Sequence, residues 1–340
     1  MSLYKSINRR KVAFIILFIL AICVLSVDSF APNKDVAIYK NYVANNNDTG
    51  INRNDVGINR NDAIIGKQPR TVRCYYYNEK NFDKSTKLAE QIGRKDVGVV
   101  YGGIVPHHLV AAPMIADFFR QINSTNFNTN GTDTKTDCIN TIYILGPNHK
   151  RVGEAVVQTV DMDWDTPFGL MNADKLSINE ISKKISTQHN PSLLEQEHSV
   201  SALVPYAKYY FSNANIVPIL LPGSMDYQQC LKLAQIIKKE ASKGSALVVA
   251  SIDFSHYLTP EEAINNDKHT LKLIEDFDYE AIMRLNNDYL DAPQVLVTFL
   301  KIMELQQTMT LTELDHKEAS SFIGEYTKET TSYFTMLFSR

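Results

Sequence analysis

The stretch VGVVYGGIVPHH (residues 97–108) joins a short apolar run to a glycine pair and two histidines. Two further stretches, INTIYILGPNH (139–149) and ALVVASIDFSH (246–256), also begin with an apolar run and end in a histidine. Short runs rich in β-branched residues predict buried strands, here at 97–101, 139–145 and 246–252. A fourth run, IVPILL (216–221), predicts one more strand, without a histidine at its end.

Helical patterns lie between and after these predicted strands. They cover roughly residues 109–121, 173–186, 199–211, 226–241, 260–284 and 293–305, and a last strand is expected near 331–338. Alternating strands and helices predict an α/β fold, as a single three-layer domain with a central, largely parallel or mixed sheet flanked by helices. A chain of 340 residues that is 44% hydrophobic can bury such a core.

The first 28 residues are expected to be a signal anchor or a signal peptide. Lys5, Arg9, Arg10 and Lys11 precede an uncharged, largely apolar run at 12–27. Basic residues before such a run predict that this end stays in the cytoplasm and the rest is exported. An uncleaved anchor is favoured because no small-x-small cleavage site precedes Asp28. The expected localisation is therefore membrane-anchored and single-pass, with an extracytoplasmic domain, or secreted if the signal is cleaved.

Residues 29–70 are polar and rich in Asn, with a tandem heptapeptide, GINRNDV at 50–56 and GINRNDA at 57–63. Asn, Asp and Gly favour turns over helices and strands, which predicts a flexible tether. Residues 71–340 remain as the α/β domain. Within it, the turn-rich stretch 161–169 contains the single Trp of the chain, and a packed connection is favoured there over a lid.

Charge and motif content exclude several function classes. The formal net charge of -3 gives no basic field for nucleic acid. The four cysteines form no CxxC pair, which argues against a Cys-based zinc site. The glycine pair at 102–103 is expected to allow a tight turn beneath the site, but it lacks the GxGxxG pattern of a dinucleotide site.

Three histidines follow the ends of predicted strands. Side chains at the carboxyl ends of parallel strands meet at one edge of a sheet, so His107, His149 and His256 are expected to converge on one buried metal site. Asp253 is a candidate partner for the second nitrogen of a ligand histidine, or else a turn cap. Glu197 and His198 open a predicted helix, where they either cap it or face the site as acid/base groups.

Five motifs appear in the order found in the MEMO family, also called AmmeMemoRadiSam system protein B. They are GGIVPHH (102–108), ILGPNH (144–149), EHSVSALVPY (197–206), IVPIL (216–220) and SIDFSHYL (251–258). The chain resembles this family over roughly residues 97–338. The family in turn resembles the catalytic subunit of class III extradiol ring-cleaving dioxygenases, without a settled reaction of its own.

This resemblance implies that His107 and His149 are metal ligands and that His256 and His198 face the metal, with His256 as an acid/base group. His108 stands where many relatives have a small residue, so it is not expected to be a ligand. The third ligand of the family is a cysteine, and that of the dioxygenases is a glutamate. Here the corresponding segment, NDYLDAP (287–293), has neither.

Asp291 is the first choice for the missing ligand and Asp288 the second, while the alternative is that Asp291 caps the helix that starts near Pro293. Two histidines and a carboxylate on one face are typical of non-haem Fe(II) oxygenases. One divalent ion is expected, with Fe(II) favoured and Zn(II) or Cu as alternatives. The expected function is that of a MEMO-like protein with a mononuclear metal site resembling that of non-haem iron extradiol dioxygenases, whose exact reaction is unsettled. If the protein is an enzyme, it is expected to be a dioxygenase-like oxidoreductase acting on an unknown small molecule. The alternatives are a non-catalytic metal-binding or redox-linked protein at the membrane surface, or a Zn-dependent hydrolase, and the family name suggests association with a radical-SAM protein.

Overall fold

The computed structural model describes residues 71–126, 139–153, 156–324 and 328–340. The expected anchor (1–28) and tether (29–70) lie outside the described residues. The prediction of a single-pass membrane protein is corrected, because no helix in the described ranges is both long enough and apolar enough to cross a membrane.

Four parallel strands form the centre of a mixed sheet that has nine strands among the described residues. They lie in the order β2 (Val100–Val105), β9 (Ala246–Ser251), β3 (Thr141–Pro147) and β8 (Asn215–Leu221). Almost every residue of these strands is buried, which is why they read as continuous apolar runs. The sequence thus predicted the central strands, with a start three residues too early for β2.

Antiparallel strands extend the sheet on both sides. On one side β12 (Thr330–Ser339) pairs with β2 and is itself flanked by β10 (His256–Leu258) and β11 (Thr310–Glu318). On the other side β4 (Val157–Thr159) pairs antiparallel with β8, and β7 (Thr187–His189) pairs parallel with β4. The fold is therefore an α/β domain with a mixed sheet whose four central strands are parallel.

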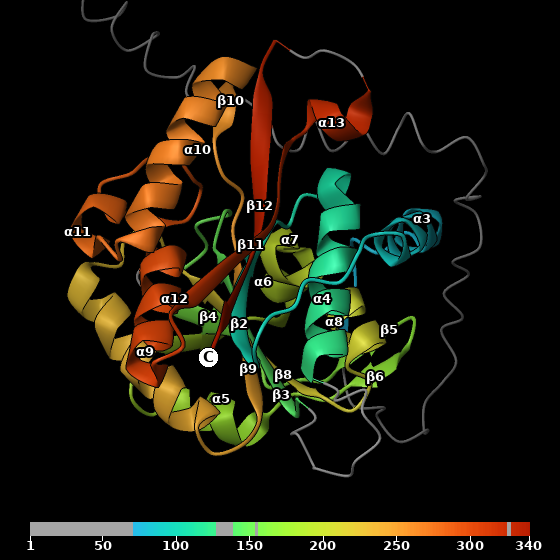
Figure 1. Ribbon diagram of the computed structural model, residues 1–340. Helices are drawn as coiled ribbons and strands as arrows, with labels where there is room; N and C mark the ends of the chain where they lie inside the picture. Colours follow the sequence, from blue (N-terminus) through green and yellow to red (C-terminus); the bar gives the residue numbers. More distant parts are fainter. Residues whose placement is uncertain (1–70, 127–138, 154–155, 325–327) are drawn as a thin grey trace, which may run out of the picture. The chain divides into compact units, whose positions relative to one another are not determined.

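Helices cover both faces of this sheet (Figure 1). One face carries α5 (Lys175–Ser182), α9 (Tyr227–Ala241), α10 (Pro260–Glu275), α11 (Tyr279–Ile282) and α12 (Pro293–Gln306). The other face carries α3 (Glu79–Glu90), α4 (Ala112–Asn126), α6 (Pro191–Gln196), α7 (His198–Ser201) and α8 (Val204–Tyr210). Asp226 and Thr259 are the N-caps of α9 and α10, and each takes part in a capping box. The N-cap side chain accepts a backbone N–H three residues later, and the side chain of that later residue accepts the backbone N–H of the N-cap.

Gly102 and Gly103 lie inside β2 and not in a turn, which corrects the expectation for this pair. A Cβ on Gly102 would lie 2.9 Å from the sulfur of Met303 in α12, and one on Gly103 would lie 2.4 Å from the ring of Phe118 in α4. Two helices therefore pack against bare backbone from opposite sides of the sheet. The glycines are needed for this close approach, and neither has a positive φ.

The stretch 161–169 is a packed connection. It contains β5 (Trp164–Thr166), which pairs with β1 (Val72–Arg73) and with β6 (Gly169–Met171) in a small second sheet. Trp164 has no exposed surface. A side chain of this size, buried in a strand between two others, fixes the segment in place.

Candidate metal centre

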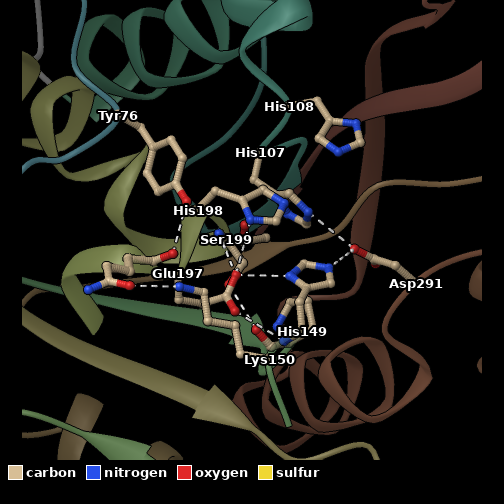
Figure 2. Close-up of polar contacts among 12 residues, drawn as sticks. Tyr76, His107, His108, His149, Lys150, Glu197, His198, Ser199 and Asp291 are labelled. Atoms are coloured by element: carbon tan, nitrogen blue, oxygen red, sulfur yellow. Dashed lines mark hydrogen bonds and ion pairs between the residues drawn. The ribbon is translucent and has the colours of Figure 1, made fainter. Parts of the chain in front are cut away.

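Three chain segments bring the predicted site residues together at the carboxyl edge of the central strands. β2 ends two residues before His107, and β3 ends two residues before His149. Asp291 comes from the segment that precedes α12. Figure 2 shows His107, His149 and Asp291 with their polar atoms directed toward one another.

The Asp291 carboxylate lies between the two imidazoles. Its Oδ2 is 3.2 Å from His107 Nε2 and 3.3 Å from His149 Nε2. Ligand atoms bound at about 2.1 Å to one ion are separated by about 3.0 Å at right angles and about 3.5 Å at the tetrahedral angle. Both separations from Asp291 Oδ2 fall within this range, so Asp291 lies where it could share a cation with either histidine.

Buried polar atoms without hydrogen bonds face this position. His107 is 1% exposed and Asp291 is 4% exposed, yet His107 Nε2 and Asp291 Oδ1 find no hydrogen-bond partner of good geometry. Buried polar atoms are nearly always satisfied, and an exception requires a cause such as a bound ion. The donor set of two imidazoles and one carboxylate suits Fe(II), Zn(II) or Mn(II).

Neighbouring side chains fix both imidazole rings. His107 Nδ1 lies 3.0 Å from Ser251 Oγ, and the backbone N–H of His107 donates to Asp253 Oδ1 at 3.0 Å. His149 Nδ1 lies 2.9 Å from Glu197 Oε1, and its backbone N–H donates to Glu197 Oε2 at 3.1 Å. In both rings Nδ1 is engaged, so Nε2 is the atom turned toward the site.

Glu197 caps a helix, which is one of the two roles that the sequence left open, and it also contacts His149. It is the N-cap of α7, where its side chain accepts a hydrogen bond from the Ser199 backbone, and the same oxygen contacts His149 Nδ1. Burial raises the pKa of Glu197, but the charge of His149 outweighs this and lowers that pKa well below its usual value. An ionised, fully buried carboxylate thus holds His149 in place.

The carboxylates also determine the protonation of His149. Burial lowers the pKa of His149, but Glu197 and Asp291 together raise it well above the usual imidazole value. Burial raises the pKa of Asp291, but the close imidazoles of His107 and His149 outweigh this, so the pKa falls to about 2. Asp291 is therefore ionised, and an incoming metal ion must displace a proton from His149.

His198 lies at the middle of a stack of imidazoles. Its ring is parallel to that of His149, with centroids 4.6 Å apart, and to that of His108, with centroids 5.7 Å apart. Burial and the neighbouring His149 lower the pKa of His198 to about 4, so its ring is neutral near pH 7. His198 therefore reaches the site, as expected.

His256 begins β10 and is buried, and its ring centroid is 6.0 Å from that of His108. His108 Nδ1 lies 2.7 Å from Asp253 Oδ2. The side chain of Asp253 therefore contacts both His107 and His108. Capping a turn is not its only role. His108 was not expected to be a ligand because many relatives have a small residue at this position, yet its side chain lies at the site beside Asp253.

The two candidates for the third ligand, Asp291 and Asp288, lie in different surroundings. Asp288 is exposed, and its carboxylate accepts a hydrogen bond from Asn286 at 3.3 Å. The N-cap of α12 is Ala292, and no side chain caps this helix. Asp291 therefore does not cap α12. Of these two aspartates, only Asp291 contacts both His107 and His149.

Two overlapping groups of three residues could each hold a cation within the described part of the chain. One is His107, His149 and His198, and the other is His107, His108 and Asp253, with the ligand atoms of each group within 4.8 Å of one another. The site is thus a cluster of imidazoles and carboxylates larger than a single triad.

Comparison with known proteins identifies the family. The sequence pattern of the Memo-like protein family matches residues 75–337. A "MEMO1 family protein" of Caldivirga maquilingensis is 30% identical over 148 residues, which are 43% of this chain and 52% of that relative. One of Methanococcoides burtonii is 30% identical over 196 residues, 54% of this chain and 66% of the relative.

A third relative, from Pyrobaculum aerophilum, is 24% identical over 258 residues, which are 72% of this chain and 85% of that protein. The chain thus aligns with about half to two thirds of the first two relatives and with most of the third. Because the family match covers nearly all of the described α/β domain, strands and histidine cluster included, this chain belongs to the Memo-like protein family.

Proposed function

We propose that this chain is an oxidoreductase of the non-haem oxygenase type, with one divalent metal ion held by His107, His149 and Asp291. The observation that carries the proposal is that one oxygen of Asp291 lies 3.2 Å and 3.3 Å from Nε2 of the two histidines. Two histidines and one carboxylate leave adjacent coordination positions open for O₂ and a substrate. Fe(II) is the favoured ion and Zn(II) or Cu the alternatives.

The bound ion would supply Lewis acidity and, as Fe(II), reactivity toward O₂. The protein residues provide position and proton transfer. Glu197 and Ser251 hold the two imidazoles by their Nδ1 atoms, and the neutral His198 and the buried His256 border the same space. His256 is assigned the acid/base role toward a substrate hydroxyl, with His198 as a second neutral imidazole. A small aromatic compound with adjacent hydroxyl groups is the proposed substrate class.

The proposal is tested by oxygen consumption. Protein loaded with Fe(II) under anaerobic conditions should consume O₂ when catechol-type compounds are added, and protein loaded with Zn(II) should not. Ring cleavage is read from the absorbance of the product. Absence of O₂ uptake with a panel of vicinal diols, in protein shown to contain Fe(II), would leave a metal-binding protein without this activity.

The three-histidine group favours a second candidate function. His107, His149 and His198 could hold Zn(II) and leave a fourth position for water, as in zinc hydrolases. The two functions differ in their third ligand, so the Asp291 variant described next separates them.

Asp291→Ala should lower the affinity for the metal ion of the proposed triad by at least about 100-fold, since it removes a direct ligand. Asp288→Ala is the matched control, because Asp288 is an exposed carboxylate three residues away. Competition with a chromophoric chelator measures the affinity for Zn(II). Unchanged affinity in Asp291→Ala would support the three-histidine site and contradict the proposed triad.

Metal affinity should rise with pH. The proton on His149 competes with the ion, so affinity is expected to grow about tenfold per pH unit below the raised pKa of His149 and to level off above it. Asp291, with a pKa of about 2, stays ionised and adds nothing to this slope. Calorimetric titration with Co(II) between pH 6 and 8 measures the effect. Glu197→Gln, which removes the main cause of the raised pKa, should flatten the slope, and a flat profile in the unmodified protein would contradict the assignment.

A further inference from the structure

His108 and Asp253 form a pair outside the proposed triad. His108 Nδ1 lies 2.7 Å from Asp253 Oδ2, and Asp253 Oδ1 accepts the backbone N–H of His107 at 3.0 Å. Asp253 is 0% exposed, so its carboxylate is held in one orientation by buried partners. Oδ2 is thereby directed at the imidazole cluster.

The charge of Asp253 is compensated by imidazoles alone among its ion-pair partners in the described residues. Oδ2 is buried and finds no hydrogen bond of good geometry. Within the residues that the structure describes, its ion-pair contacts are imidazoles, His108 at 2.7 Å and His107 Nε2 at 3.6 Å, with no Lys or Arg among them. A buried carboxylate of this kind is costly unless a cation is close to it.

The rings divide the cluster into two ends. The parallel stack places His198 between His149 and His108, and His107 stands across all three at interplanar angles of 71°, 79° and 82°. At one end of the stack His149 contacts Asp291, and at the other end His108 contacts Asp253. Figure 2 shows His108 on the other side of His107 from His149.

The two carboxylates are neighbours even though their positions, 253 and 291, are 38 residues apart in the sequence. The backbone N–H of Asp291 donates to the carbonyl of Asp253 at 3.2 Å, and His107 Nε2 lies 3.2 Å from one carboxylate and 3.6 Å from the other. Ions bound to these carboxylates would therefore lie side by side. Paired ions in two-metal enzymes are about 3.5–4 Å apart.

We propose that His108 and Asp253 hold a second divalent cation beside the first, so that the centre is dinuclear. The proposal rests on the proposed triad of His107, His149 and Asp291 for the first ion. His108 Nδ1 and Asp253 Oδ2 need to separate only from 2.7 Å to about 3.0 Å to bind one ion together. Water or substrate completes the coordination, and His256 borders this second position.

A dinuclear centre would also specify the substrate class more closely. Two adjacent ions can each bind one oxygen atom of the same molecule, and the two hydroxyls of a vicinal diol could be bound in this way. The second ion would stabilise the negative charge on a diol hydroxyl after its proton has passed to an imidazole such as His256.

The test is the number of ions bound. Full-length protein is freed of metal with a chelator, dialysed against micromolar Zn(II), and analysed by mass spectrometry of the element. Two ions per chain are expected in the unmodified protein and one in His108→Ala. His189→Ala is the matched control, because His189 is an exposed histidine paired with the exposed Asp161, and it should keep two ions.

Electron paramagnetic resonance adds an independent reading. Mn(II)-loaded protein should give an exchange-coupled spectrum of two nearby ions, and His108→Ala should give that of isolated Mn(II). His108→Gln repeats the test with a side chain of closer volume. One ion per chain in the unmodified protein, or two in both His108 variants, overturns the second site and leaves the triad standing. No bound ion in the unmodified protein overturns both proposals.

Discussion

The double variant His107→Ala/His149→Ala is expected to lose the ion held by the proposed triad, with at least a 1000-fold drop in affinity as an order of magnitude. Both substitutions remove direct ligands and leave Asp291 as the one remaining member of the triad. Competition with a chromophoric chelator for Zn(II) measures the loss. The same titration reports the second site separately, since the double variant keeps His108 and Asp253.

A matched double variant, His189→Ala/His269→Ala, removes two exposed histidines and should bind Zn(II) as the unmodified protein does. Circular dichroism checks that both variants are folded. Replacing two imidazoles that contact the Asp291 carboxylate leaves that buried charge unpaired, so a modest decrease in melting temperature is expected as well. If the first double variant bound Zn(II) with unchanged affinity, these histidines would not be the ligands.

Gly103→Ala should destabilise the fold by about 3 kcal/mol, because the added methyl group has no space. Its Cβ would lie 2.4 Å from the Phe118 ring and 2.5 Å from the backbone oxygen of Met336 in the paired strand β12. A ring could rotate away, but the backbone oxygen is held by the sheet. The melting temperature is expected to fall by about 5–10 °C, as measured by calorimetry.

Gly93→Ala is the control for this substitution, since a Cβ at Gly93 meets nothing within 4 Å and the residue has no positive φ. Its stability should change by no more than about 0.5 kcal/mol. An equal effect of the two substitutions would show that close packing of α4 against β2 is not the reason for glycine at 103. Metal binding in Gly103→Ala, measured below its melting temperature, tests how far the strain reaches His107 at the end of the same strand.

The sequence by itself determined the strands of the sheet centre and the positions of three histidines after strand ends. Apolar runs of six or seven residues at 139–145, 216–221 and 246–252 coincide with β3, β8 and β9, because a strand buried on both faces must be apolar throughout. The antiparallel β11 was missed. All its residues except the exposed Thr310 are half-buried, so it has neither a continuous apolar run nor a clear alternation.

The tertiary structure alone decided how the polar groups of the site are paired. Asp291 meets His149 across 142 residues of sequence, and Asp253 meets His107 across 146. Such pairs depend on which strand lies next to which and on how the segment before α12 passes the end of β9, and neither is encoded locally. The same is true of His108, whose contact with Asp253 makes it part of the site although its position in the motif argued against it. Residue type thus limits which side chains can bind a metal, while only the packing of distant segments determines which of them meet.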